Sequence, residues 1–258
     1  MAKNYLTVQP DRVALLGRNF TQGRGGRKIR YITRHHTAGV LDADAINRVW
    51  ASRPASAHYL VDPKGIVSQH VWDAATAWSN ANSVSNQESL TIEHSNSAGA
   101  GQDWPINDIT VKEGARWAAA LCLFYGLGKP EFGRNIRDHR EFSATSCPYH
   151  LAKGGKYHQT WMDEARRFYD VLAAAKAGNV TAPKPPAPEK QEETPAMPDH
   201  DRVPSLINPD VKLTLQHYRQ LQDAYAWENR AALRGLYDAL GLDYDATITA
   251  AIEADLSK

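Results

Sequence analysis

Strand-like and helix-like patterns alternate along the first 177 residues of the chain. Strand-like runs cover residues 28–36, 57–71 and 88–96, and the second run is divided by a turn signal between Pro63 and Gly65. Helix-like runs cover residues 42–52, 111–128 and 157–176. Asp42 or Asp44 can cap the first helix, and Thr110 and Glu113 are spaced as a capping box ahead of the second. This alternation predicts an α/β layer fold, which usually places its chemistry at strand ends and loops.

A proline-rich stretch divides the chain. The segment GNVTAPKPPAPEKQEETPAMPDHD, residues 178–201, holds few apolar residues and predicts an extended linker. The residues after it predict a small all-α module, because apolar residues recur there with helical spacing. This stripe consists of Leu213, Tyr218, Leu221, Tyr225, Leu233, Leu236 and Leu240, followed by Ile248, Ile252 and Leu256. So short a module buries little core alone, so we expect the stripe to pack against another copy, against the preceding domain or against a wall ligand. Homo-oligomerisation is the first choice among these and wall targeting the second.

Charge is spread unevenly along the chain. The formal net charge is only +1, which argues against a bulk nucleic-acid binder. Residues 1–36, however, carry eight basic side chains against Asp11 alone. Such a basic lobe can attract an anionic polymer such as a cell wall or nucleic acid, or it can be a solvated surface.

Membrane and export signals are missing from the sequence. No apolar run reaches the roughly 18 residues of a transmembrane helix, and the first residues lack the apolar core of a signal peptide. The two cysteines are too few for a disulfide framework. We therefore expect the protein to begin its life in a cytoplasm. Cys122 lies in a helical apolar run and is expected in the core, whereas Cys147 lies among turn-forming residues.

Histidine and cysteine residues form a candidate metal site. A catalytic zinc site uses three nitrogen, sulfur or carboxylate ligands and leaves one position for water. His139 and Cys147 are eight residues apart, and either His35 or His36, at the end of the first strand, can complete the set. Neighbouring side chains on a strand point to opposite faces, so only one of these two histidines is expected to reach the ion.

Five motifs together resemble the zinc-dependent N-acetylmuramoyl-L-alanine amidases. They are RYITRHHTAG, SAHYLVDPKGIVSQHV, TAWSNA, SLTIEHSN and DHREFSATSCP, in the order typical of this family, and the resemblance extends over about residues 29–171. The family includes bacteriophage endolysins, bacterial wall-recycling amidases and animal peptidoglycan recognition proteins. The resemblance implies a mixed central β-sheet flanked by helices.

The resemblance also assigns roles to residues. It places the zinc ligands at His35, His139 and Cys147, with His36 as a packed neighbour, and the catalytic glutamate at Glu93. Zinc lowers the pKa of bound water to about 7, and a nearby carboxylate can accept the proton as the amide is attacked.

The sequence departs from parts of the family pattern. Ala57 stands where many relatives have a tyrosine, Thr145 stands where the phage prototype has a lysine, and Ser79 replaces the histidine of a tryptophan–histidine pair. Thr145 and His58 are therefore the candidates that assist zinc in stabilising the oxyanion. His70, His94 and His150 are expected to be structural.

The resulting hypothesis is an endolysin-like peptidoglycan hydrolase. It has a catalytic domain at residues 1–177, with a basic segment at 1–28, a linker at 178–203 and a helical module at 204–258. With zinc it would cleave the amide between N-acetylmuramic acid and the L-alanine of the stem peptide, after leaving a host cytoplasm through a membrane pore. Two alternatives remain: a binding module that recognises peptidoglycan without cutting it, and a zinc endopeptidase of the stem peptide.

Overall fold

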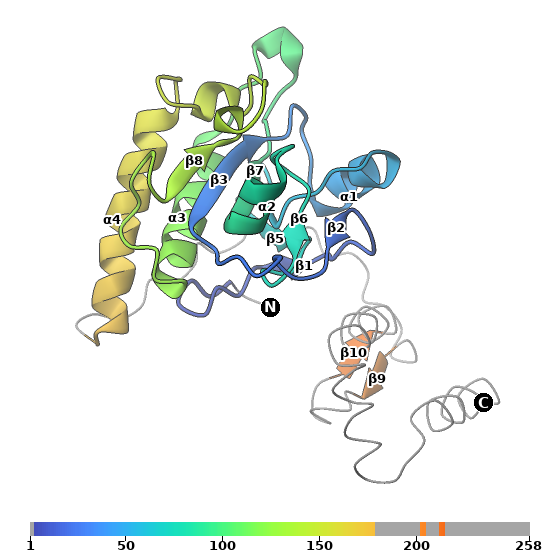
Figure 1. Cartoon of the computed structure of the whole chain (residues 1–258), viewed down its shortest axis with the longest axis horizontal. Coiled ribbons are helices and arrows are strands. Elements are labelled where there is room, and N and C mark those ends of the chain that lie inside the picture. Colours follow the sequence, from blue (N-terminus) through green and yellow to red (C-terminus); the bar gives the residue numbers. More distant parts are fainter. Residues whose placement is uncertain (1–2, 179–201, 205–211, 215–258) are drawn as a thin grey trace, which may run out of the picture. The chain divides into compact units, whose positions relative to one another are not determined.

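The computed structural model describes residues 3–178, 202–204 and 212–214 (Figure 1). The chain forms two compact units, Met1–Lys190 and Gln191–Lys258. Among the described residues no helix is both long and apolar enough to cross a membrane.

A six-stranded mixed sheet forms the centre of the first unit, as expected. Its strand order is β1-β5-β4-β7-β3-β8. All neighbouring strands are parallel except β4 and β5, which form the antiparallel hairpin predicted around the turn at Gly65. The strands are β1 (Arg12–Val13), β3 (Tyr31–His36), β4 (Tyr59–Val61), β5 (Val67–Gln69), β7 (Ser89–His94) and β8 (Ile136–Asp138).

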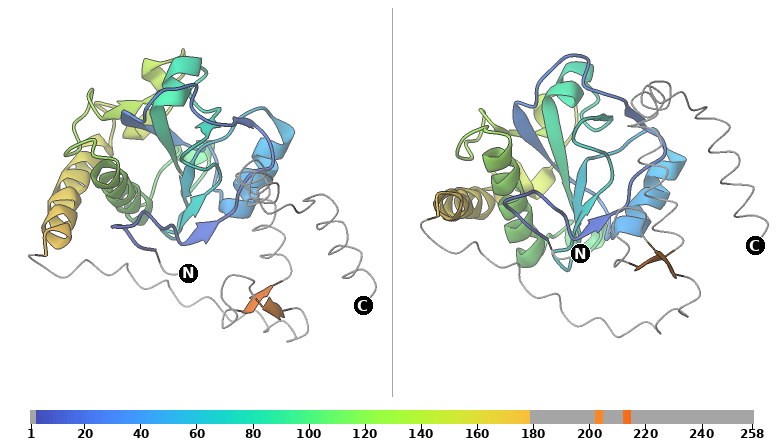
Figure 2. Two further views of the ribbon diagram at one scale, coloured as in Figure 1. Left: turned by 60° about the horizontal axis from the view of Figure 1, so that its bottom comes forward. Right: turned by 90° about the horizontal axis from the view of Figure 1, so that it is seen from below.

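Alternation along the strands gives the sheet two different faces. Ile32 on β3 and Ile92 on β7 point into the main core, where they pack against the long helices α3 (Asp108–Phe124) and α4 (His158–Lys176). These two helices lie side by side on that face (Figure 2). The short helix α2 (Ser83–Glu88) lies over the opposite face, which carries His35 and Glu93.

The helix α1 (Ala43–Ser52) follows β3 and begins at the predicted cap, where the Asp42 side chain accepts the Ala45 N–H. Its residues Ile46 and Trp50 pack in a smaller cluster with Leu60 of β4. The loop between β3 and α1 therefore starts at the strand end where the predicted ligand His35 lies.

The predicted capping box of α3 is wrong. Asn107 caps the helix by accepting the Thr110 N–H at 2.9 Å, so the helix starts before Thr110. The Thr110 hydroxyl instead donates to the Asp62 carbonyl, and the Glu113 carboxylate binds the N-terminal segment. Asn107 and Thr110 are both suitable capping residues, and tertiary contacts of Thr110 and Glu113 decided between them.

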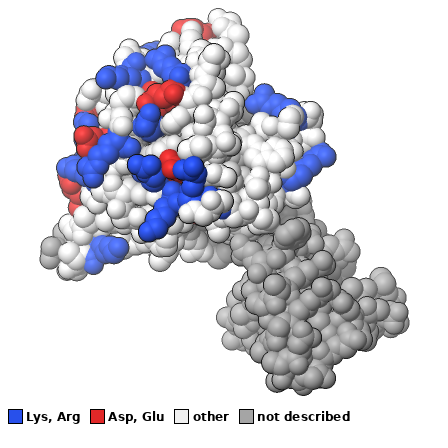
Figure 3. Space-filling model, viewed as in Figure 1, with Lys and Arg blue, Asp and Glu red and all other residues white. Residues whose placement is uncertain are grey.

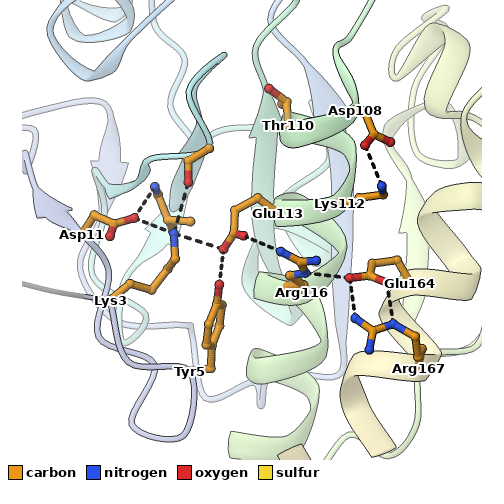
Figure 4. A network of polar contacts seen from close by, with 12 residues as sticks. Lys3, Tyr5, Asp11, Asp108, Thr110, Lys112, Glu113, Arg116, Glu164 and Arg167 are labelled. Carbon is orange, nitrogen blue, oxygen red and sulfur yellow. Dashed lines mark hydrogen bonds and ion pairs between the residues drawn. The ribbon is translucent and has the colours of Figure 1, made fainter. Parts of the chain in front are cut away.

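The N-terminal segment is part of the fold. β1 extends the sheet, and β2 (Phe20–Thr21) pairs with β6 (Thr76–Ala77). Lys3 is only 4% exposed, and its Nζ lies 2.7 Å from Asp11 Oδ2 and 3.1 Å from Glu113 Oε1 (Figure 4). Arg34 is fully buried and pairs with Asp138 at 2.7 Å. The basic residues before His36 are thus not one solvated lobe, because some of them are neutralised inside the protein.

Two short antiparallel strands are described in the second unit, β9 (Arg202–Pro204) and β10 (Lys212–Thr214). Leu213, which the pattern assigned to a helix, therefore lies in a strand. The remainder of the predicted helical stripe lies outside the described residues, as does most of the predicted linker.

Candidate metal centre

Three parallel strands end at the edge of the sheet that carries the candidate site. His35 lies next to last in β3 and pairs in register with Glu93, which lies next to last in β7. β8 lies on the other side of β3, and His139 follows its last residue. Because parallel strands present the same ends at one edge, residues that are more than 100 positions apart in sequence meet there.

Cys147 completes the cluster from the loop after β8. One ligand atom each from His35, His139 and Cys147 lie within 4.8 Å of one another. Cys147 Sγ is 3.7 Å from His35 Nδ1, and the rings of His35 and His139 are 4.5 Å apart between centroids. The structure therefore brings together the three residues that the sequence proposed as ligands.

The donor atoms in this cluster suit a zinc ion. The two ring nitrogens of His139 are buried and form no hydrogen bond with any residue of the described chain. Burial lowers the pKa of His139. Burial and the neighbouring His139 ring lower the pKa of His35. Both rings are therefore neutral, as metal binding requires. Burial and the nearby Glu93 raise the pKa of the Cys147 thiol, so a thiolate here needs a cation beside it.

Asn80 fixes the orientation of His35, and sequence reasoning missed it. Its Oδ1 lies 3.0 Å from His35 Nε2 and accepts that N–H, so that Nδ1 is the nitrogen that faces Cys147. Asn80 is fully buried and donates to the Ser89 hydroxyl at 3.1 Å. Its one sequence signal is its place in the TAWSNA motif, directly after Trp78 and Ser79.

His94 supports the same strand from the other face. Its Nδ1 donates to the His35 carbonyl at 2.9 Å, while its Nε2 accepts the Trp161 indole N–H at 3.0 Å. Burial lowers its pKa to about 3, and a Cβ at Gly114 of α3 would lie 2.1 Å from its Nε2. His94 is thus a structural residue, as predicted, and α3 needs a glycine where it crosses this ring.

Glu93 lies beside the cluster, because it pairs in register with His35. It is half-buried, and its Oε2 has no hydrogen-bond partner within the described residues. Burial raises the pKa of Glu93 to about 7. A carboxylate with this pKa can both accept and return a proton near neutral pH.

The other predicted site residues lie around the cluster in different ways. His36 donates its backbone N–H to Cys147 Sγ at 3.5 Å, which agrees with its role as a neighbour of the ligands. The Thr145 hydroxyl accepts the Cys147 N–H at 3.2 Å and so shapes the ligand loop.

The side chain of His58 contacts other residues than the predicted ligands. It is fully buried, with Nδ1 3.0 Å from the Thr91 hydroxyl and Nε2 3.0 Å from the Arg24 guanidinium. Its Nε2 also lies 3.2 Å from the Ala75 carbonyl. None of these contacts within the described residues is with a predicted ligand, so the catalytic role of His58 stays a prediction. His70 and His150 have structural partners, Asn47 and Asp103 respectively.

The comparison with protein families agrees with this geometry. Residues 25–150 match the family model of the N-acetylmuramoyl-L-alanine amidases, Amidase_2. This part of the chain belongs to that family. The matched segment holds all three predicted ligands and Glu93, so the cluster lies within the amidase domain.

Solved structures share the fold of the amidase domain. The structure of PlyL aligns over 61% of this chain and 97% of its own, at 21% identity and a TM-score of 0.50. The Staphylococcus aureus hydrolase AmiA aligns over 66% of this chain and 86% of its own, at 16% identity and a TM-score of 0.50. No curated protein sequence matches the chain.

Proposed function

We propose that the protein is a zinc-dependent peptidoglycan hydrolase that cleaves the amide between N-acetylmuramic acid and the L-alanine of the stem peptide. The observation that supports this proposal most strongly is the meeting of His35, His139 and Cys147 beside Glu93 at one edge of the sheet. The amidase family match of the same residues supplies the substrate class.

The chain's own residues divide the chemistry among them. His35, through Nδ1, His139 and Cys147 Sγ would hold the metal. A bound zinc ion acts as a Lewis acid that lowers the pKa of water to about 7 and polarises a carbonyl. Glu93 accepts the proton of the attacking water at its carboxylate and can return it to the leaving amine.

Surrounding groups keep this arrangement in place. Asn80 holds the His35 ring in one tautomer, and His94 holds the His35 backbone from the far face. The Thr145 hydroxyl accepts the Cys147 N–H and so contacts the ligand loop. Of the two predicted helpers, Thr145 and His58, Thr145 is therefore the better candidate for stabilising a developing oxyanion.

An endolysin role is part of the same proposal. The proline-rich stretch and the additional C-terminal residues suit an enzyme that works on a polymer rather than on free muropeptides. In this role the protein would wait in the cytoplasm of a host, reach the wall through a membrane pore and lyse the cell. Oligomerisation through the C-terminal residues remains a prediction.

Digestion of purified peptidoglycan tests the reaction. The assay follows new amino groups, new reducing sugar ends and the newly exposed N-terminal residue, with and without a strong zinc chelator. We expect chelator-sensitive release of N-terminal L-alanine and no reducing ends. Another N-terminal residue would identify a stem-peptide endopeptidase, reducing ends would identify a glycosidase, and binding without cleavage would identify a recognition module.

A further inference from the structure

A buried ion pair joins β3 to β8 directly behind the metal cluster. Arg34 precedes the predicted ligand His35 and pairs in register with Asp138, which precedes the predicted ligand His139. The Arg34 guanidinium donates Nε–H and a terminal N–H to the same oxygen, Asp138 Oδ1, at 2.9 and 2.7 Å. Because side chains alternate along a strand, this pair lies on the face of the sheet opposite to the one that carries His35.

Burial sets this pair apart from the charges at the surface. Figure 3 shows lysine, arginine, aspartate and glutamate side chains on one face of the molecule, whereas Arg34 and Asp138 are 0% and 1% exposed. Removing two charges from water costs about as much as their attraction returns, so apolar side chains of similar volume would stabilise the fold as well. A guanidinium–carboxylate pair adds a fixed distance and direction, because its hydrogen bonds are directional.

The Arg34 guanidinium is itself held in place by α4. Its central carbon lies 4.8 Å from the ring centroid of Trp161, and a terminal nitrogen lies 3.1 Å from His158 Nδ1. Trp161 also donates its indole N–H to His94, whose other nitrogen binds the His35 carbonyl. The residues behind β3 therefore hold the strand on both sides of its predicted ligand.

The second oxygen of Asp138 closes the loop that carries the other two predicted ligands. Asp138 Oδ2 accepts the Lys153 N–H at 2.9 Å. The loop of residues 139–152 thus begins after Asp138 and returns to its side chain, and both His139 and Cys147 lie within it. One carboxylate therefore connects this loop to the residue that precedes His35.

A backbone hydrogen bond holds the two ligand segments of the loop together. Arg140, which follows His139, donates its N–H to the Cys147 carbonyl at 3.0 Å. At the start of the loop, the Asp138 N–H donates to Glu141 Oε1 at 2.6 Å. A displacement of the loop at Asp138 would therefore move both ligands relative to β3.

We propose that Asp138, oriented by Arg34, is the positioning residue of the metal centre. Its two oxygens join the ligand loop to β3, where the ligand atoms of His35, His139 and Cys147 lie within 4.8 Å of one another. Ligands that are already held together lose less conformational entropy on binding, so this carboxylate raises the affinity for zinc. The assignment rests on the metal centre of the proposed function.

The first test removes one hydrogen-bond donor and leaves the buried pair intact. Lys153→Pro has no backbone N–H for Asp138 Oδ2, and Ala152 before it already has φ −61° and ψ 157°, which a residue before proline prefers. Lys153→Ala is the matched control, because it loses the same exposed side chain and keeps the N–H. A zinc titration against a chromophoric chelator should give an affinity at least about tenfold lower for Lys153→Pro than for Lys153→Ala.

The second test replaces the ion pair by apolar side chains. Arg34→Met with Asp138→Leu should leave the metal-free protein folded in urea titrations and lower the zinc affinity at least about tenfold. The control is Lys3→Met with Glu113→Leu, which removes another buried pair, 3% and 2% exposed, between the N-terminal segment and α3. We expect this control to bind zinc within about twofold of the wild type. If the Arg34 and Asp138 double variant does not fold, the comparison at Lys153 decides alone.

Hydrogen exchange gives a readout without the metal. In the metal-free proteins, the amides of residues 139–152 should exchange faster in Lys153→Pro than in Lys153→Ala. Equal zinc affinities of these two variants would overturn the proposal. An equal fall of zinc affinity in the Lys3 and Glu113 control would overturn it as well, because loss of any buried pair would then have the same effect.

Peptidoglycan digestion by the wild type separates this proposal from the reaction. If zinc affinity depends on Asp138 and Lys153 as expected but no amide is cleaved, the proposed reaction fails and the positioning role stands. If the amide is cleaved and Lys153→Pro binds zinc as tightly as Lys153→Ala, the positioning role fails alone.

Discussion

Replacing Asn80 by leucine should weaken zinc binding without removing a ligand. The His35 side chain donates its Nε2–H to Asn80 Oδ1 at 3.0 Å. Leucine has a similar volume but no acceptor, so the buried N–H would lose its partner at a cost of about 1–3 kcal/mol. The ring would also lose the contact that selects its tautomer, and losses of this type lower metal affinity about 10–100-fold.

A histidine outside the site provides the matched control for this variant. His70, which follows β5, has its Nδ1 2.7 Å from Asn47 Oδ1 of α1, and neither residue belongs to the cluster. Asn47→Leu should lower stability by a similar amount and leave zinc affinity unchanged. The assay is a competitive zinc titration against a chromophoric chelator, with urea unfolding of the metal-free proteins alongside.

The comparison of these two variants can refute the role assigned to Asn80. If Asn80→Leu binds zinc within twofold of the wild type while losing as much stability as Asn47→Leu, then Asn80 supports the fold and does not orient the ligand. Asn80→Asp, which keeps an acceptor oxygen, should retain most of the zinc affinity.

Three further substitutions test other parts of the structure. Cys147→Ser should lower zinc affinity at least about tenfold and abolish cleavage, because a hydroxyl is a poorer zinc ligand than a thiolate; an active, metal-replete variant in metal analysis would disprove the ligand assignment. Glu93→Gln should retain zinc and lose about 10²–10⁴-fold in kcat. Because burial raises the pKa of Glu93 to about 7, the metal-free wild type should lose stability as the pH rises from about 4.5 to 7, and urea midpoints of the Gln variant should lack this loss. Lys3→Met should lower the free energy of unfolding by about 3 kcal/mol, because it removes a buried partner of Glu113. The control Lys129→Met removes an exposed ion pair and should change the free energy of unfolding by less than about 1 kcal/mol. Thermal or urea unfolding measures both.

Local patterns predicted the elements that carry the site. The apolar run before His35 predicted β3, the cap at Asp42 predicted the start of α1, and the run before Glu93 predicted β7. These signals are local, because strand alternation and capping act over a few residues.

Contacts between distant residues left no such pattern. The motif that contains Asn80 does not indicate its role, because its partner His35 is 45 positions away. The ligand set itself came from resemblance to a family, since spacing alone left His35 and His36 as equal candidates.

Charge counting failed for a related reason. It describes how many basic residues a segment has but not which of them face solvent. Lys3 and Arg34 are buried against Glu113 and Asp138 respectively, so the count of exposed positive charge was too high. Burial of a charged side chain depends on a partner that the fold supplies.

The N-terminal residues set a practical limit on how this domain can be cut and recombined. The family match begins at residue 25, yet Lys3 and Tyr5 both contact Glu113 of α3, and Arg24 donates to the carbonyls of Asp73 and Ser89. A fragment that starts at the family boundary would expose the edge of β5 and leave Glu113 without its lysine. Chimeric proteins built from this amidase-family domain should therefore keep residue 3 onward and place any fused domain after α4.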